Sequence, residues 1–194
     1  MVVVGVGGVG INSVQGAASA GARFVIAIDP VEFKRDKAKE FGATHTFASL
    51  EEALPVIGEI TWGGKMADVT VITVGEIHGD IIQPALSATG KGGQVVVVGM
   101  GGHYADSQVT LSLFELTLLQ KRLQGAIFGG GVGPRSQIPK LLDHYRSGAL
   151  KLDELVTKTY KLEEINEGVR RHARRKESAG DDRLHGGRLL IVSL

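Results

Sequence analysis

Blocks of apolar and polar residues alternate along this chain in a pattern that predicts strands and helices in turn. The run 24–28 is continuously apolar, which is typical of a strand buried on both faces. The run 33–41 is charged and amphipathic, and Gly42 follows it as a helix end signal. The expected strands are 2–4, 24–28, 45–47, 68–74, 94–98 and 122–128, and the expected helices are 11–20, 33–41, 50–60, 81–88, 111–119 and 134–145.

Two local signals modify this pattern. Pro55 predicts an interruption of the helix expected over 50–60. The glycines between 90 and 93 predict a turn before the strand at 94–98. The alternation of strands and helices with right-handed crossovers predicts an α/β fold, a doubly wound parallel sheet of Rossmann type. Such sheets bind ligands beyond the carboxyl ends of their strands.

Composition excludes several classes of function. Across 194 residues, 22 Lys and Arg balance 21 Asp and Glu, so the net charge of +1 gives no argument for a nucleic-acid or membrane partner. The absence of Cys excludes disulfides, iron–sulfur clusters and a thiolate zinc site within this chain. No apolar run reaches about 18 residues, and the first residues lack a basic signal-peptide region. We therefore expect a cytoplasmic protein.

The clearest chemical motif is a glycine turn between the first expected strand and helix. Gly5, Gly7 and Gly10 fit the spacing G-x-G-x-x-G. In this motif the first glycine permits a tight turn, the second lets a pyrophosphate approach the backbone, and the third lets the helix pack closely on the sheet. The helix N-terminus then offers N–H groups and a positive dipole end to phosphates. The alternative is an ordinary glycine-rich turn, but the flanking strand and helix favour dinucleotide binding.

Asp29 ends the second expected strand, 19 residues after Gly10, near the spacing expected for a ribose-binding acid. A carboxylate there accepts hydrogen bonds from both ribose hydroxyls and repels a 2′-phosphate, so it favours NAD over NADP. Lys34 and Arg35 follow closely and complicate this interpretation. They are either cofactor contacts or the solvated start of a helix, and the second explanation is a serious competitor for Arg35.

Four segments resemble the zinc-dependent medium-chain alcohol dehydrogenases: GVGGVG, AIDPVEFKRDKAKEFGATH, LFELTLLQKRLQGAIFGG and LKLDELVTKTYKLEEINEG. The resemblance runs from residue 2 to 168 and is greatest to the actinobacterial nicotinoprotein (NDMA-dependent), class III-like branch. It implies NAD as cofactor and hydride transfer between NAD and a primary alcohol or an S-hydroxymethyl thiol adduct. The matching cofactor positions are Gly5, Gly7, Gly8, Val9, Gly10, Asp29, Lys34, Thr73, Val74, Gly75, Val98, Gly99, Met100, Ala126, Ile127 and Phe128. For the hydrophobic members, core packing is the competing explanation of the side chains, so their expected contacts are mainly through the backbone.

In the resembled family a separate GroES-like domain carries the catalytic zinc, and we expect that domain to be absent from this chain. The six His residues show no metal-binding spacing, so we expect neither metal ligands nor catalytic residues here. The chain would hold the cofactor and by itself be inactive. The alternative is a stand-alone NAD-binding module that senses redox state or joins a partner subunit. The resemblance also implies a homodimer through the sheet edge at 122–128.

The last part of the chain departs from the family pattern. We expect an NAD-binding domain over residues 1–168 and an aberrant tail over 169–194, which holds seven of the 22 basic residues. A nucleic-acid arm and a solvated tail are two explanations. We favour a third, because residues 169–186 can be back-translated with synonymous codons selected so that the frame one nucleotide later reads YDDMHAGKNLRGTIVYTE, which resembles the family ending. One extra nucleotide near codon 168 would explain the tail.

Overall fold

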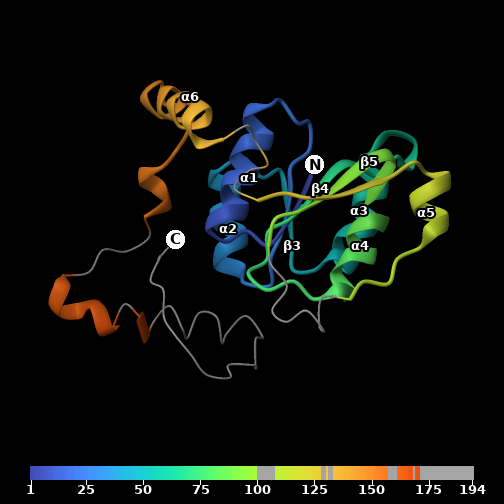
Figure 1. Cartoon of the computed structure of the whole chain (residues 1–194), viewed down its shortest axis with the longest axis horizontal. Coiled ribbons are helices and arrows are strands. Elements are labelled where there is room, and N and C mark those ends of the chain that lie inside the picture. Colours follow the sequence, from blue (N-terminus) through green and yellow to red (C-terminus); the bar gives the residue numbers. More distant parts are fainter. Residues whose placement is uncertain (100–107, 128–129, 131–132, 157–160, 168, 171–194) are drawn as a thin grey trace. The chain divides into compact units, whose positions relative to one another are not determined.

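The computed structural model describes residues 1–99, 108–127, 130, 133–156, 161–167 and 169–170. Within them, six strands form one parallel sheet in the order β3-β2-β1-β4-β5-β6 (Figure 1). The strands are β1 (Val2–Val4), β2 (Ile26–Ile28), β3 (His45–Phe47), β4 (Ala67–Ile72), β5 (Thr89–Val97) and β6 (Arg122–Gly125). The helices are α1 (Gly8–Ser19), α2 (Glu32–Glu40), α3 (Leu50–Ile60), α4 (Ile82–Ser87), α5 (Leu113–Leu118) and α6 (Pro134–Arg146). The expected doubly wound parallel sheet is confirmed.

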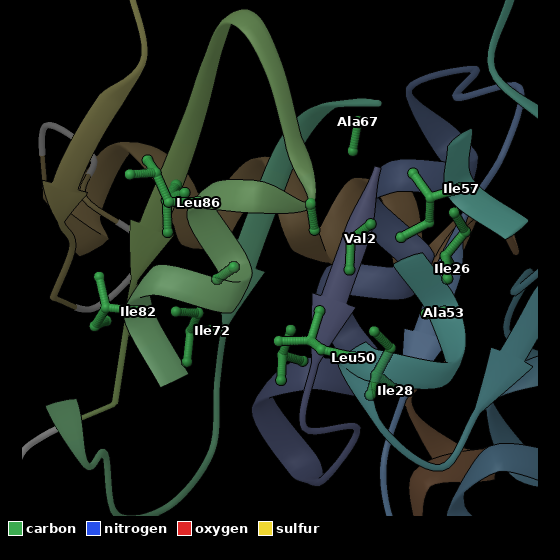
Figure 2. Packing of buried hydrophobic residues seen from close by; sticks show 14 of the residues in the cluster. Val2, Ile26, Ile28, Leu50, Ala53, Ile57, Ala67, Ile72, Ile82 and Leu86 are labelled. Atoms are coloured by element: carbon green, nitrogen blue, oxygen red, sulfur yellow. The ribbon is translucent and has the colours of Figure 1, made fainter. Parts of the chain in front are cut away.

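Helices cover both faces of the sheet, as the continuous apolar strands require. Side chains of successive strand residues point to opposite faces. Val2 and Ile26 face the side on which Leu50 and Ile57 of α3 and Leu86 of α4 pack, and Figure 2 shows these side chains together. The intervening residues of β1 and β2 are also buried, and α1 and α2 contact these strands. Burial on both faces explains why β1 and β2 show no polar alternation.

The expected break at Pro55 is not observed, because α3 continues from Leu50 to Ile60 with Pro55 inside it. Ser49 caps the helix by accepting a hydrogen bond from the Glu52 N–H at 3.4 Å. Ala53 and Ile57 are fully buried against the sheet. A proline removes one backbone hydrogen bond from a helix, and we infer that burial of the apolar face outweighs that loss.

The turn expected at 90–93 also differs, since these residues belong to β5. The pairing with β4 is irregular there: Ala67 pairs with Thr89, whereas Val69 already pairs with Gln94. The extra residues form an irregularity within the strand in place of a separate turn. Glycine tolerates the left-handed conformation that such an irregularity needs, and Gly92 adopts φ +74°.

Helix α5 is attached to the fold by a polar network. The Lys121 ammonium group is 2.7 Å from Glu115 Oε2 and also donates to the Leu86 carbonyl at 2.7 Å. Glu115 Oε1 accepts from Gln83 and Ser87. Burial alone would raise the pKa of the Glu115 carboxyl, but the Lys121 ion pair and these hydrogen bonds outweigh burial and lower it. The network holds α5 against α4 and against the start of β6.

The chain divides into two compact units, Met1–Leu150 and Lys151–Leu194. In the second unit the described residues form short 3-10 turns at Asp153–Leu155 and Leu162–Glu164. The region expected to be an aberrant tail lies outside the described residues from position 171 onward. No helix in the described part of the chain has the length and apolarity to cross a membrane.

Two glycines of α1 provide a matched test of the packing between this helix and the sheet. A Cβ at Gly10 would collide with the Gly5 carbonyl oxygen and lie 2.6 Å from Thr73 Oγ1, whereas a Cβ at Gly16 would meet nothing within 4 Å. We expect Gly10→Ala to lower the free energy of unfolding by about 1–3 kcal/mol. We expect Gly16→Ala to raise it by about 0.5–1 kcal/mol, because alanine favours the helix. Denaturant unfolding measures both, and equal effects of the two substitutions would contradict this packing.

Candidate functional site

The strand ends form one aligned row at the carboxyl edge of the sheet. Val4 pairs with both Ile28 and Ile72, Ile72 pairs with Val97, and Val97 pairs with Gly125. Each of these residues is the last of its strand. The next residue along the chain in each case is a predicted site residue, and the row consists of Gly5, Asp29, Thr73, Val98 and Ala126. The parallel register therefore brings five separately predicted segments to one edge.

The glycine turn has the geometry that its motif predicts. Gly5 has φ +84°, and its N–H donates to the Ile28 carbonyl at 2.7 Å. Gly7 is the N-cap of α1, so the N–H groups of Gly8 and Val9 in the first helical turn have no acceptor within the helix. A Cβ added to Gly7 would meet nothing within 4 Å. The turn combines a tight bend, a helix N-terminus and open space beside the backbone.

The segment that follows β4 binds the backbone of this turn, and the segment that follows β5 packs against the one that follows β4. The Thr73 hydroxyl donates to the carbonyls of Val4, at 3.2 Å, and Gly5. A Cβ at Gly99 would collide with the Val74 carbonyl oxygen. Thr73 is therefore committed to the backbone of the glycine turn, and the close approach at Gly99 brings the segment after β5 against the one after β4.

Asp29 joins the first and second turns through its carboxylate. Oδ2 accepts a hydrogen bond from the Val6 N–H and Oδ1 accepts one from the Val31 N–H, both at 3.0 Å. Asp29 is only 3% exposed. A carboxylate offers about four acceptor positions, so about two remain beside these two bonds, and the Lys34 ammonium group lies close to the one on Oδ2. Val6 and Val31 act through backbone N–H groups, which no side-chain pattern in the sequence indicates.

The two basic residues that complicated the choice of cofactor have different surroundings. Lys34 Nζ lies 3.5 Å from Asp29 Oδ2. Arg35 NH1 donates to the backbone carbonyls of Asp29 and Pro30, each at 2.8 Å. Both cations are directed to the turn after β2, so neither side chain is simply a solvated part of α2. The positions of Lys34 and Arg35 in the sequence do not show that one lies beside the Asp29 carboxylate and the other binds backbone carbonyls.

The last predicted segment is described only in part. Ala126 N–H donates to the Val97 carbonyl at 2.8 Å, which continues the sheet pairing, and Ile127 is 70% exposed. Met100 and Phe128 lie outside the described residues. The expected strand over 122–128 is thus observed over Arg122–Gly125.

The described residues do not fit a metal ion. Among them, no three His, Asp or Glu side chains gather in a group that could bind one. His103, His172 and His185 lie outside the described part. Among the described residues, the aligned row offers backbone N–H groups, carbonyls and one carboxylate. Such donors and acceptors suit an organic anion that carries hydroxyl groups.

A family model described as zinc-binding dehydrogenase matches residues 8–147. The chain is 52% identical over 166 residues to alcohol dehydrogenase B of Mycobacterium tuberculosis H37Rv, covering 86% of this chain and 44% of that protein. It is 52% identical over 167 residues to the NDMA-dependent alcohol dehydrogenase of Amycolatopsis methanolica, again with 86% and 44% coverage. It thus spans less than half the length of these relatives.

A solved structure is also similar to this chain over less than half of its own length. The alcohol dehydrogenase zinc-binding domain protein from Burkholderia ambifaria superposes with a TM-score of 0.77 at 31% identity, over 92% of this chain and 45% of that one. The family match extends over well more than half of the 194 residues, from the glycine turn through α6. The chain therefore belongs to the zinc-binding dehydrogenase family.

Proposed function

We propose that residues 1–168 form the NAD(H)-binding domain of a zinc-type alcohol dehydrogenase, and that the tail over 169–194 takes no part in cofactor binding. The observation that carries this proposal is the aligned row at the carboxyl edge, where the glycine turn and the Asp29 carboxylate meet. Doubly wound sheets bind dinucleotides at this edge. The similarity to two alcohol dehydrogenases at 52% identity supports the assignment of the parent activity.

The residues present fit a dinucleotide in two parts. The pyrophosphate would lie against the N-terminus of α1, where Gly7 leaves room for it and backbone N–H groups and the helix dipole favour negative charge. The adenosine ribose would place its two hydroxyls on the remaining acceptor positions of Asp29, beside Lys34. A 2′-phosphate would meet the Asp29 carboxylate and be repelled, so the site favours NAD over NADP.

The remaining predicted site residues would contact the nicotinamide half of the cofactor. They lie in the segments that follow β1, β4, β5 and β6, and for most of them we propose contact through the backbone. They are Gly8 and Val9 of α1, Thr73, Val74 and Gly75 after β4, Val98, Gly99 and Met100 after β5, and Ala126, Ile127 and Phe128 after β6.

In the longer protein we propose hydride transfer between NAD and a primary alcohol or an S-hydroxymethyl thiol adduct. The described residues include the proposed cofactor site, and among them no three metal-ligating side chains form a group. This chain would accordingly bind and orient the cofactor, while the groups that polarise the alcohol would come from the remainder of a full-length relative. By itself it would not oxidise alcohols.

We further propose that two copies associate through β6. This strand is at the edge of the sheet, and all four of its residues are exposed. An unpaired edge exposes backbone N–H and C=O groups, which a second copy can satisfy in a symmetric contact. Leu113, Phe114 and Leu118 of α5 are exposed as well, because this helix directs Glu115 inward to Lys121. An outward apolar face next to an open edge favours self-association.

Asp29→Asn tests the ribose site. Loss of the negative charge should weaken NADH binding about 10- to 100-fold, since hydrogen bonds to a charged acceptor contribute about 1.5–3 kcal/mol. NADPH binding should not fall, so the preference for NADH narrows. Fluorescence titration of NADH and NADPH measures both affinities, with Asp36→Asn on the exposed side of α2 as the control. Equal affinity of the unmutated chain for the two cofactors would contradict the assignment.

Gly7→Ala tests the phosphate site separately from the fold. The added methyl group meets no protein atom within 4 Å, so only the replacement of a glycine N-cap should lower the free energy of unfolding, by at most about 1 kcal/mol. It projects into the space proposed for the pyrophosphate, and NADH affinity should fall at least about tenfold. Calorimetric titration with NADH, together with thermal unfolding, measures the two effects. Unchanged affinity would place the phosphates elsewhere.

Ile127→Glu tests the proposed dimer. A carboxylate at this exposed position would be buried beside its own copy across a two-fold axis, so the variant should sediment as a monomer. Trp62→Glu is the matched control, because Trp62 is 84% exposed and lies in the 3-10 turn after α3. Sedimentation velocity at high protein concentration distinguishes the states, and a monomeric unmutated chain would refute the proposal.

A further inference from the structure

Arg35 binds the backbone of the turn that carries Asp29. The side chain comes from the first half of α2, and its NH1 donates to the Asp29 and Pro30 carbonyls at 2.8 Å each. A terminal nitrogen of a guanidinium group carries two N–H bonds in one plane, so a single nitrogen can serve both carbonyls. This side chain thereby links the helix to the end of β2.

The same short turn is held at its other polar groups by different partners. The Asp29 N–H donates to the Phe47 carbonyl at 3.2 Å, and the Asp29 carboxylate accepts from the N–H groups of Val6 and Val31. Arg35 donates a hydrogen bond to the Asp29 carbonyl. Backbone and side chain of Asp29 are thus fixed from β3, from the glycine turn and from α2 together. The direction of the carboxylate depends on all three.

We infer that Arg35 is a positioning residue for cofactor selection. It acts through the Asp29–Pro30 backbone to hold the Asp29 carboxylate toward the ribose hydroxyls, because both N–H bonds of its NH1 are directed to the two carbonyls of that turn. This inference rests on the proposed NAD(H) site. A basic residue six positions after the ribose acid would otherwise be read as favouring NADP. Here Arg35 holds the turn that carries Asp29, and it therefore favours NAD.

The two possible roles of Arg35 predict opposite changes in cofactor preference. If Arg35 positions Asp29, Arg35→Gln weakens NADH binding about three- to tenfold and leaves NADPH binding unchanged. If Arg35 instead binds a 2′-phosphate, the same substitution weakens NADPH binding more than NADH binding. Fluorescence titration of both cofactors with the whole chain separates these outcomes. Lys39→Gln is the control, because Lys39 lies on the same helix and pairs with the exposed Asp36.

A second readout excludes a general effect on the fold. ADP-ribose and its analogue lacking the 2′- and 3′-hydroxyls of the adenosine ribose are compared by calorimetry. If Arg35 positions Asp29, Arg35→Gln should weaken the binding of ADP-ribose about three- to tenfold and leave the affinity for the analogue unchanged. Equal weakening of both ligands would mean that Arg35 serves only the fold, and would overturn the inference.

Further outcomes separate this inference from the proposed function. An unmutated chain that binds neither NADH nor ADP-ribose would refute both. An unmutated chain that prefers NADH, with the same preference in Arg35→Gln, would refute only the role of Arg35. If Arg35→Gln does not fold, Arg35→Lys replaces it. This variant keeps the charge and loses the planar group, and a narrowed NADH preference supports the inference while an unchanged one overturns it.

Discussion

The close approach of α1 to the end of β1 is the constraint on which the site depends. Gly10 has no room for a side chain because the Gly5 carbonyl lies against it, and the Thr73 hydroxyl donates to that same carbonyl. The helix N-terminus is thereby held directly above the strand ends. A side chain at position 10 would push α1 outward and move its first N–H groups away from the turn. Packing and ligand binding therefore impose the same requirement on one residue.

The parallel register extends this local constraint across the sheet. Because the last residues of β1, β2, β4, β5 and β6 are aligned, the five following residues form a row. Asp29 then connects two members of the row, since its carboxylate accepts the Val6 N–H of the glycine turn. The site is consequently built mostly from backbone groups, and few of its residues need a particular side chain. That explains how glycines and apolar residues can make up most of the proposed cofactor site.

On helix α5, which precedes the edge strand β6, apolar side chains face the solvent while an acidic side chain faces inward. Helix α5 directs Glu115 inward to Lys121 and leaves Leu113, Phe114 and Leu118 exposed. A buried lysine is tolerated only when paired, and here the Leu86 carbonyl accepts a second hydrogen bond from Lys121 beside the Glu115 pair. The ion pair and the hydrogen bond offset the cost of burying that charge, and they fix the position of α5 and of the start of β6. The exposed apolar face and the open strand edge follow from this arrangement.

The sequence by itself determined the α/β class, the parallel sheet and the positions of the glycine turn and of Asp29 at the strand ends, because apolar periodicity and glycine spacing are local properties. Only the tertiary structure decided the rest. Helix α3 continues through Pro55 where local rules predict a break, and glycines 90–93 lie within β5. Arg35 binds two carbonyls that are close to it in sequence, yet only the fold of the turn after β2 directs them to one nitrogen. Such choices depend on burial and on distances between segments, which no local pattern contains.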